Sequence, residues 1–176
     1  MKTSIALIGF MGTGKTVVGK ALAEKLGKEF VELDSLIEQM AGKTIPEIFK
    51  EDGEIAFREL EIEATKEVSK KKNTVIACGG GVVLNKINID RLRKESTIVY
   101  LTASPRAILK RTLSEGETRP LLNVQDKISE IRELLSFRRP FYERAADITI
   151  NTSKLDIDSI VERIMEKVKE DEGFNR

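Results

Sequence analysis

Short runs of apolar residues alternate along this chain with stretches in which apolar positions recur at helical spacing. The apolar runs predict strands at residues 4–8, 29–33, 74–77, 97–101 and 147–150. Helical spacing predicts helices at residues 15–26, 35–40, 53–71, 125–136 and 155–168, and Ser104-Pro105 indicates the start of another. Strands that alternate with helices predict an α/β fold in three layers, with helices on both faces of a five-stranded, mainly parallel sheet.

Length and composition narrow the class of protein. A chain of 176 residues suits one domain, here residues 1–176, and no repeat or linker divides it. Its 30 basic and 29 acidic residues leave a net charge of +1, which argues against nucleic-acid or membrane-surface binding. We find neither a membrane-spanning apolar stretch nor a signal peptide. The single cysteine, Cys78, suits a reducing compartment, so we expect a cytoplasmic monomer without nucleic-acid or membrane partners.

The first loop carries the most specific motif. Gly9-Phe10-Met11-Gly12-Thr13-Gly14-Lys15-Thr16 fits the pattern G-x-x-x-x-G-K-[ST] between a predicted strand and a predicted helix. Backbone N–H groups of such a loop wrap phosphates, and the following helix points its N-terminus at them. We therefore expect the backbone of residues 12–16 to bind a nucleotide, Lys15 to reach its β- and γ-phosphates, and Thr16 to hold Mg²⁺. A glycine-rich turn that binds nothing is the alternative.

Other features favour a small-molecule kinase over a motor or switch. Motor and switch NTPases place a metal-binding aspartate at the end of a buried strand, whereas the strand at 74–77 ends in Cys78 and glycines. The segment Asn85-Lys86-Ile87-Asn88 lacks the final aspartate of a guanine-specifying motif. Without histidine, a carboxylate must serve the acceptor hydroxyl, and Asp34 at the end of the second strand suits that role. Its alternative role is to cap a helix that begins at Ser35.

Two concentrations of arginine indicate an anionic acceptor. Arg58 lies three residues after Ile55 and four before Ile62, so it points along an apolar stripe, and Glu61 could orient it. Arginine clamps carboxylates through two parallel hydrogen bonds, although an Arg–Glu pair can be merely structural. The run Arg138-Arg139-Pro140-Phe141-Tyr142 is the second concentration, with a basic helix end as the alternative.

Two loops complete the predicted site. Gly79-Gly80-Gly81 follows a buried strand and lets a ligand approach bare backbone at the carboxyl edge of the sheet, where a plain flexible turn is the alternative. Residues 112–124 lack periodicity and include Arg119. A mobile lid that carries an arginine is expected in a phosphotransferase, because water must be kept from the γ-phosphate; a solvated surface loop is the alternative.

Together these residues resemble the shikimate kinase family, a branch of the P-loop kinases. The resemblance covers about residues 4 to 150 and rests on the order and spacing of short motifs: Gly9 to Thr16, Asp34 with Ile37-Glu38, Phe57-Arg58 with Glu61, Gly79 to Gly81, Arg111, Arg119-Pro120-Leu121-Leu122, and Arg138 with Pro140 and Tyr142. It implies that ATP phosphorylates the 3-hydroxyl of shikimate, with Mg²⁺ as cofactor and the helical region at 34–61 as part of the acceptor site.

The resemblance also implies individual roles. Asp34 contacts the ring hydroxyls and serves catalysis, Arg58 and Arg138 bind the carboxylate, and the triple glycine lines the pocket. Arg111 lies against the adenine, and Arg119 closes over the phosphates as a third catalytic residue beside Lys15 and Asp34.

Two positions depart from the family pattern. Glu32 replaces an aspartate that supports Mg²⁺, so we expect it to reach the metal through water beside Thr16, with altered geometry. Cys78 replaces a small hydroxyl residue before the triple glycine, and a thiol is a poorer hydrogen-bond donor. The functional alternatives are a kinase of another small hydroxylated acid or of a nucleoside monophosphate, and a nucleotide-binding protein without catalysis.

Overall fold

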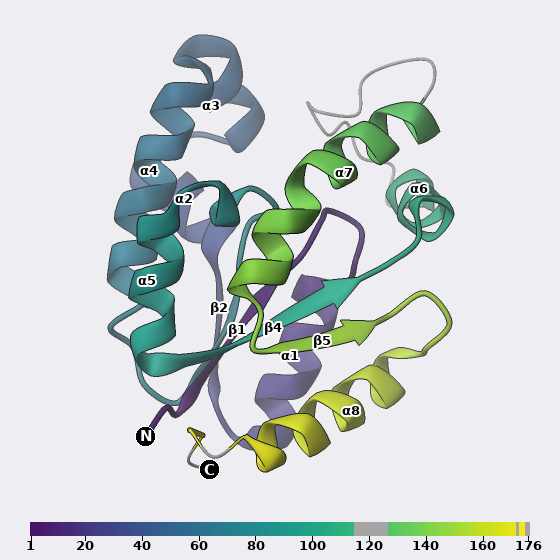
Figure 1. The fold of residues 1–176 in the computed structure, drawn as a ribbon. Helices are drawn as coiled ribbons and strands as arrows, with labels where there is room; N and C mark the ends of the chain where they lie inside the picture. The colour runs from purple at the N-terminus through teal and green to yellow at the C-terminus, as the bar shows by residue number, and fades with distance from the viewer. Residues whose placement is uncertain (115–126, 172, 175–176) are drawn as a thin grey trace.

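The computed structural model describes residues 1–114, 127–171 and 173–174 (Figure 1). Its sheet is built from five parallel strands in the order β2-β3-β1-β4-β5. The strands are β1 (Ser4–Ile8), β2 (Glu29–Glu32), β3 (Thr74–Ala77), β4 (Ser96–Thr102) and β5 (Ile148–Asn151). All four pairings are parallel, which confirms the predicted α/β class. The carboxyl ends of β1, β2 and β3 carry the phosphate loop, Asp34 and the triple glycine, so the topology brings the three motifs to one edge.

Two apolar cores form because β1 is buried on both faces. Ile5 and Leu7 pack with α1 (Lys15–Leu26) and α8 (Ile157–Glu170), whereas Ala6 and Ile8 face the opposite core. That second core takes residues from the 3-10 helix η1 (Val82–Leu84) and from the remaining α-helices, which are α2 (Leu33–Ala41), α3 (Ile45–Glu51), α4 (Gly53–Val68), α5 (Lys86–Glu95), α6 (Pro105–Ser114) and α7 (Lys127–Ala145). None of the described helices is long and apolar enough to cross a membrane.

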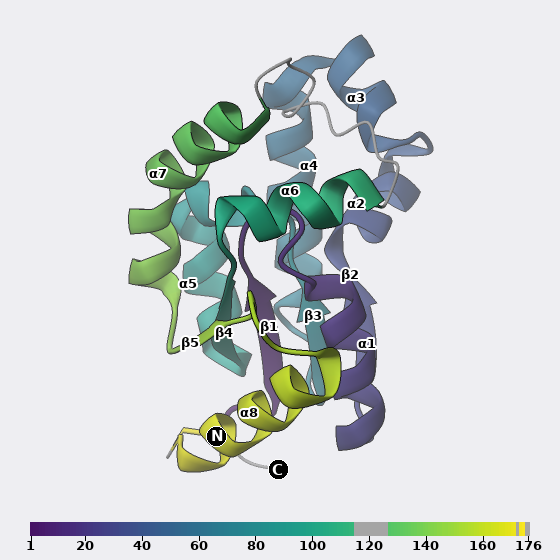
Figure 2. The same cartoon turned by 90° about the vertical axis from the view of Figure 1, so that its right-hand side faces the viewer.

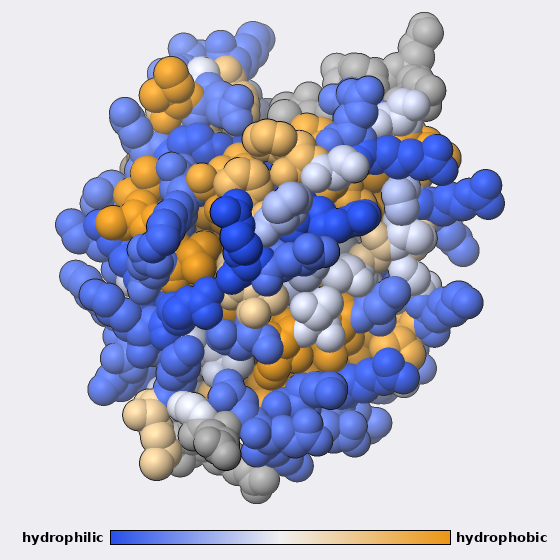
Figure 3. Space-filling model, viewed as in Figure 1, coloured by the Kyte–Doolittle hydropathy of each residue, from blue (hydrophilic) through white to orange (hydrophobic). Residues whose placement is uncertain are grey.

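Figures 1 and 2 show how these helices frame the carboxyl edge of the sheet. The α2–α4 group stands at one end of this edge and α7 at the other, and both views agree on this separation. Hydrophilic residues predominate on the face seen in Figure 3, and hydrophobic residues form smaller groups among them.

Two helices were not predicted, and one was predicted too short. α3 begins with a capping box in which Thr44 accepts from the Glu47 amide while the Glu47 side chain accepts from the Thr44 amide. α5 has few buried apolar residues and many charges, so its periodicity is weak. α7 was expected to end at residue 136 but continues through Pro140 to Ala145, so Arg138 lies within the helix and not at its end.

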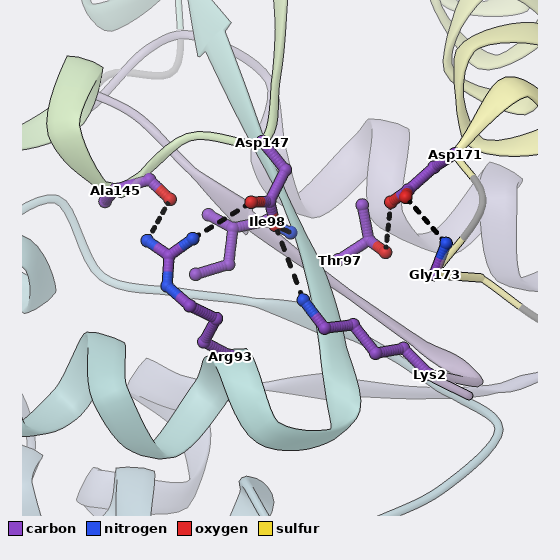
Figure 4. A network of polar contacts seen from close by, with 8 residues as sticks. All are labelled: Lys2, Arg93, Thr97, Ile98, Ala145, Asp147, Asp171 and Gly173. Carbon is purple, nitrogen blue, oxygen red and sulfur yellow. Dashed lines mark hydrogen bonds and ion pairs between the residues drawn. The ribbon is translucent and has the colours of Figure 1, made fainter.

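A network of charged residues lies at the opposite edge of the sheet, the amino edge, where the strands begin (Figure 4). Asp147, just before β5, accepts hydrogen bonds from Arg93 of α5 at 2.9 Å and from the Ile98 amide at 2.8 Å. Lys2 lies 3.9 Å from the same carboxylate, and Arg93 also donates to the Ala145 carbonyl at 2.9 Å. These contacts join the N-terminus, the end of α5 and the end of α7 to the sheet.

Candidate active site

The phosphate loop forms the first part of the site. Gly12 and Gly14 adopt φ values of 74° and 91°, a left-handed conformation that favours glycine, and Gly14 caps α1. The Lys15 ammonium donates to the carbonyls of Gly9 and Phe10, both at 2.8 Å. The Thr13 hydroxyl donates to the Phe10 carbonyl at 2.7 Å. The side chains of the motif therefore hold the loop in shape while α1 directs its N-terminus toward the loop.

Thr16 and Glu32 are the candidate metal ligands. Glu32 ends β2 and is the N-cap of α2, and one of its carboxylate oxygens accepts from the Ser35 hydroxyl at 2.9 Å. Among the described residues, no group of three or more His, Cys, Asp or Glu side chains could hold a metal ion. A hydroxyl and one carboxylate nevertheless fit Mg²⁺, because this ion keeps several waters and takes other ligands from substrate phosphates.

The triple glycine is surrounded by the predicted acceptor residues. A Cβ on Gly79 would lie 2.9 Å from an Asp34 oxygen and 3.2 Å from a Glu61 oxygen. A Cβ on Gly80 would lie 3.3 Å from an Arg138 nitrogen, and one on Gly81 would lie 2.6 Å from Nη2 of Arg58. Each glycine thus makes room for a different charged group. The structure therefore brings Asp34, Arg58 and Arg138 together as predicted, and the turn is not a plain flexible connection.

Asp34 is not a helix cap. α2 begins at Leu33 with Glu32 as its N-cap, so Asp34 lies inside the first turn and projects toward Gly79. A carboxylate in the first turn of a helix is stabilised by the positive end of the helix dipole. The carboxylate is therefore held in place beside the glycine turn, and its alternative role as a cap is wrong.

Arg58, which is partly exposed, and the buried Glu61 form an ion pair on α4. Nη1 of Arg58 lies 3.0 Å from Oε1 of Glu61, and Nη2 lies 3.4 Å from Glu54. The Glu61 side chain has no exposed surface, and burial raises the pKa of its carboxyl while Arg58 opposes that shift. Arg58 Nε and Glu61 Oε2 are buried without a hydrogen-bond partner in the described part of the chain. Asn88 Oδ1 and Ser96 Oγ are in the same state elsewhere in the fold. What singles out the Arg58 and Glu61 atoms as candidates for ligand binding is that both side chains lie against the glycine turn.

Arg58 does not lie on the apolar stripe that was expected for α4. Ile55 was expected to share a buried stripe with Arg58, but Ile55 is 78% exposed and Ile62 is only half-buried. The buried face of α4 instead carries Phe57, Glu61, Ala64, Thr65 and Val68. Arg58 points inward because its guanidinium pairs with Glu61 and lies against Gly81.

Arg138 and Tyr142 enter the site from α7. Arg138 is buried, with its guanidinium carbon 5.7 Å from the centre of the Phe10 ring, so it lies between the phosphate loop and Gly80. Among the described residues it belongs to no ion pair. One turn later, the buried Tyr142 hydroxyl donates to the Gly80 carbonyl. Sequence reasoning assigned no role to Tyr142, because its partner is a backbone carbonyl 62 residues away.

Arg111 lies on the other side of the phosphate loop. Its guanidinium donates to the Gly12 carbonyl at 3.2 Å and to the Thr152 carbonyl at 2.9 Å. The Thr152 hydroxyl donates to the Thr102 carbonyl at 2.9 Å and accepts from Arg111 at 3.1 Å. Thr152, which sequence reasoning missed, therefore fixes the planar guanidinium beside the phosphate loop.

The predicted lid cannot be placed as a whole. Residues 112–114 belong to the end of α6, whereas residues 115–124, with Arg119, lie outside the described residues. A hollow of about 270 Å³ lies elsewhere, between α5 and α7, and none of the predicted site residues lines it. The chemistry of the side chains therefore locates the candidate site at the glycine turn.

A phosphate loop opening α1, a parallel 2-3-1-4-5 sheet and an acceptor region of arginines and a carboxylate define a P-loop kinase. The family model for shikimate kinase matches residues 11–169. A shikimate kinase of Caldanaerobacter subterraneus is 50% identical over 162 residues, which cover 92% of this chain and 94% of the relative. The chain belongs to the shikimate kinase family.

Solved structures agree with this assignment. A shikimate kinase from Acinetobacter baumannii in complex with shikimate matches with a TM-score of 0.92 and 36% identity, over 98% of this chain and 96% of the other. The shikimate kinase from Aquifex aeolicus matches with a TM-score of 0.82 and 32% identity, over 95% and 96% of the two chains.

Proposed function

We propose that this chain transfers the γ-phosphoryl group of ATP to the 3-hydroxyl of shikimate. The observation that supports this most directly is the meeting of Asp34, Arg58 and Arg138 around the triple glycine, beside the phosphate loop. Shikimate offers one carboxylate and several ring hydroxyls, which suit two arginines and one aspartate. The related Acinetobacter baumannii enzyme was solved in complex with shikimate, which supports the same acceptor here.

The acceptor is held by complementary charge. Arg58 and Arg138 bind the carboxylate, because guanidinium groups pair with carboxylates through parallel hydrogen bonds. Asp34 accepts hydrogen bonds from ring hydroxyls and positions the 3-hydroxyl for attack. The glycines at 79–81 let the ring approach the backbone closely, since any side chain there would meet Asp34, Arg138 or Arg58.

The donor is held by the phosphate loop. Backbone N–H groups of residues 12–16 and the Lys15 ammonium bind the phosphates, and Arg111 stacks against the adenine. Thr16 and, through water, Glu32 would hold Mg²⁺, which would supply charge stabilisation for the β- and γ-phosphates. We expect Arg119, which lies outside the described residues, to close over the phosphates.

The reaction needs positioning more than a strong base. Phosphoryl transfer passes through a loose transition state, so Lys15 and Arg119 stabilise charge while Asp34 accepts the hydroxyl proton late. A covalent intermediate on Cys78 is unnecessary, and burial raises the pKa of that thiol to about 12, so it stays protonated. The lone buried thiol also suits the reducing cytoplasm, where we expect the protein to act as a monomer.

An ADP-release assay with a panel of acceptors tests the proposal. Release should depend on shikimate and should be much slower with quinate, gluconate or AMP. ADP release that does not depend on any acceptor would instead support a nucleotide-binding protein without transfer, and a preference for AMP would support a nucleoside-monophosphate kinase. Mg²⁺ removal with a chelator should stop the shikimate-dependent release.

A further inference from the structure

Tyr142 joins the triple glycine to α7. It is fully buried, and its hydroxyl donates to the Gly80 carbonyl. The two neighbouring carbonyls are bonded differently: Gly79 accepts from the Val82 amide at 3.2 Å and Gly81 accepts from the Leu84 amide at 3.1 Å. The amides of the 3-10 helix η1 (Val82–Leu84), which follows the turn, therefore satisfy the two outer carbonyls, while the middle carbonyl is held by a side chain of α7.

The tyrosine ring is rigidly placed. It stacks on Tyr100 of β4 with ring centres 4.9 Å apart and planes inclined by 20°. Burial raises the pKa of Tyr142 to about 12 although the Arg138 guanidinium, which also hydrogen-bonds this hydroxyl, opposes the shift. The hydroxyl therefore keeps its proton and remains a donor at neutral pH. A rigid ring on the central sheet thus carries a permanent donor to the glycine turn.

The position of Gly80 sets the geometry of the arginine pair. Arg138 lies one helical turn before Tyr142 and next to Gly80, whereas Arg58 lies against Gly81. A shift of the turn by a few tenths of an ångström changes the space available between the two guanidinium groups. The Lys15 bonds to the Gly9 and Phe10 carbonyls stay within the phosphate loop. The Gly80 backbone lies beside that loop, because a Cβ there would be 3.6 Å from the Met11 nitrogen and 3.7 Å from the Gly9 carbonyl oxygen, so the KM for ATP must be measured together with the KM for shikimate.

We propose that Tyr142 is a positioning residue for the acceptor: by holding the Gly80 carbonyl, it fixes the glycine turn at the distance from Arg138 that the shikimate carboxylate requires. This inference rests on the proposed acceptor site. It assigns Tyr142 to shikimate binding and not to ATP binding or to the chemical step.

The test compares Tyr142→Phe with Tyr100→Phe, because each variant removes one hydroxyl and keeps the stacked rings. Tyr142→Phe should raise the KM for shikimate about tenfold, since a buried carbonyl loses its donor, while the KM for ATP changes less than about twofold. Tyr100→Phe should leave both values within about twofold of the unmodified protein. An unchanged KM for shikimate in Tyr142→Phe, or an equal rise in both KM values, overturns the inference.

A second measurement decides the question if Tyr142→Phe does not fold. The chain has 2 tyrosines and no tryptophan, so Tyr142 is the only tyrosine in the Tyr100→Phe variant. Shikimate should change the near-ultraviolet absorption and fluorescence of that tyrosine, and ATP alone should not. A spectrum that shikimate leaves unaltered at saturation overturns the inference.

Arg138→Ala separates this inference from the proposed function. A large rise in the KM for shikimate in Arg138→Ala, without one in Tyr142→Phe, rejects only the role of Tyr142. An unchanged KM in Arg138→Ala rejects the acceptor site itself.

Discussion

The two edges of the sheet each gather arginine, lysine and carboxylate side chains, but they differ in how completely the charges are paired. At the amino edge, Asp147 accepts bonds from Arg93 and from the Ile98 amide, and Lys2 lies nearby (Figure 4). At the carboxyl edge, Arg58 Nε and Glu61 Oε2 are buried without partners among the described residues. The Asp147 carboxylate thus has its partners within the protein, whereas two atoms of the Arg58–Glu61 pair have none among the described residues.

The difference shows what distinguishes a structural network from a binding site. Charge clusters occur in both, so their number of charges says little about function. A structural network joins distant segments and satisfies its own polar groups, as Asp147 does for α5 and β4. A binding site holds polar groups in fixed directions and leaves some of them unsatisfied, because the substrate supplies the remaining bonds.

Replacing one lysine at each edge should give the largest contrast in kcat between the two edges. Lys15→Met should lower kcat by about a thousandfold or more, because it removes the ammonium that stabilises charge on the transferred phosphoryl group. Lys2→Met, at the amino edge, should leave kcat within about twofold, since its ion pair is partly exposed and 3.9 Å long. Steady-state assays at saturating ATP and shikimate measure both. A Lys15→Met protein that retains a tenth of the activity would contradict the assigned role.

Replacing one arginine at each edge should separate an effect on shikimate binding from an effect on stability. Arg58→Ala should raise the KM for shikimate by about 10- to 100-fold, because the lost interaction is a charge-assisted bond to the bound acceptor. Arg93→Ala should lower the melting temperature and leave that KM unchanged, since its bonds go to Asp147 and Ala145. An unchanged KM in Arg58→Ala would argue against the carboxylate clamp.

The sequence predicted the residues at the carboxyl edge much better than the network at the amino edge. The phosphate loop is contiguous, so its pattern specifies both residues and local shape. Asp34, Arg58 and Arg138 are separated by many residues, so the residue types made them candidates for an anionic acceptor site. Their individual roles came from the resemblance, because no local rule brings them together. The Asp147 network was not predicted at all, because its partners come from the N-terminus, α5 and β4.

Helix prediction failed where apolar periodicity is weak or misleading. α5 was missed because Ile89 and Leu92 are its only buried apolar residues in a strongly charged helix. The stripe expected on α4 was wrong because the fold buries Glu61 and exposes Ile55. A helix that faces a polar site does not show its buried face through hydrophobicity, so periodicity predicted α4 itself but not its orientation.

Asp147 should matter for stability and not for activity. Asp147→Ala should destabilise the fold by about 1–3 kcal/mol, because the Ile98 amide and Arg93 lose their common acceptor. Asp147→Asn keeps one acceptor oxygen and should lose less. Urea denaturation measures the free energy of unfolding, and the KM values for both substrates should not change. A rise in the KM for shikimate would show that the two edges are coupled through α7.

The pH dependence of stability should report the burial of the Glu61 carboxylate. Burial raises the pKa of Glu61 above its usual 4.5, so the unfolded chain loses this proton at lower pH than the folded chain. The corresponding contribution to stability is present below the unfolded pKa and is lost as the pH rises through the folded one. Relative to the unmodified protein, Glu61→Gln should therefore become progressively more stable from about pH 4.5 upward. Thermal melts between pH 4 and pH 8 measure this difference, with Glu54→Gln as a control on the exposed side of Arg58. A difference that stays constant over this range would show that Arg58 offsets the desolvation of Glu61 completely, and the pair would then resemble the closed network at the other edge.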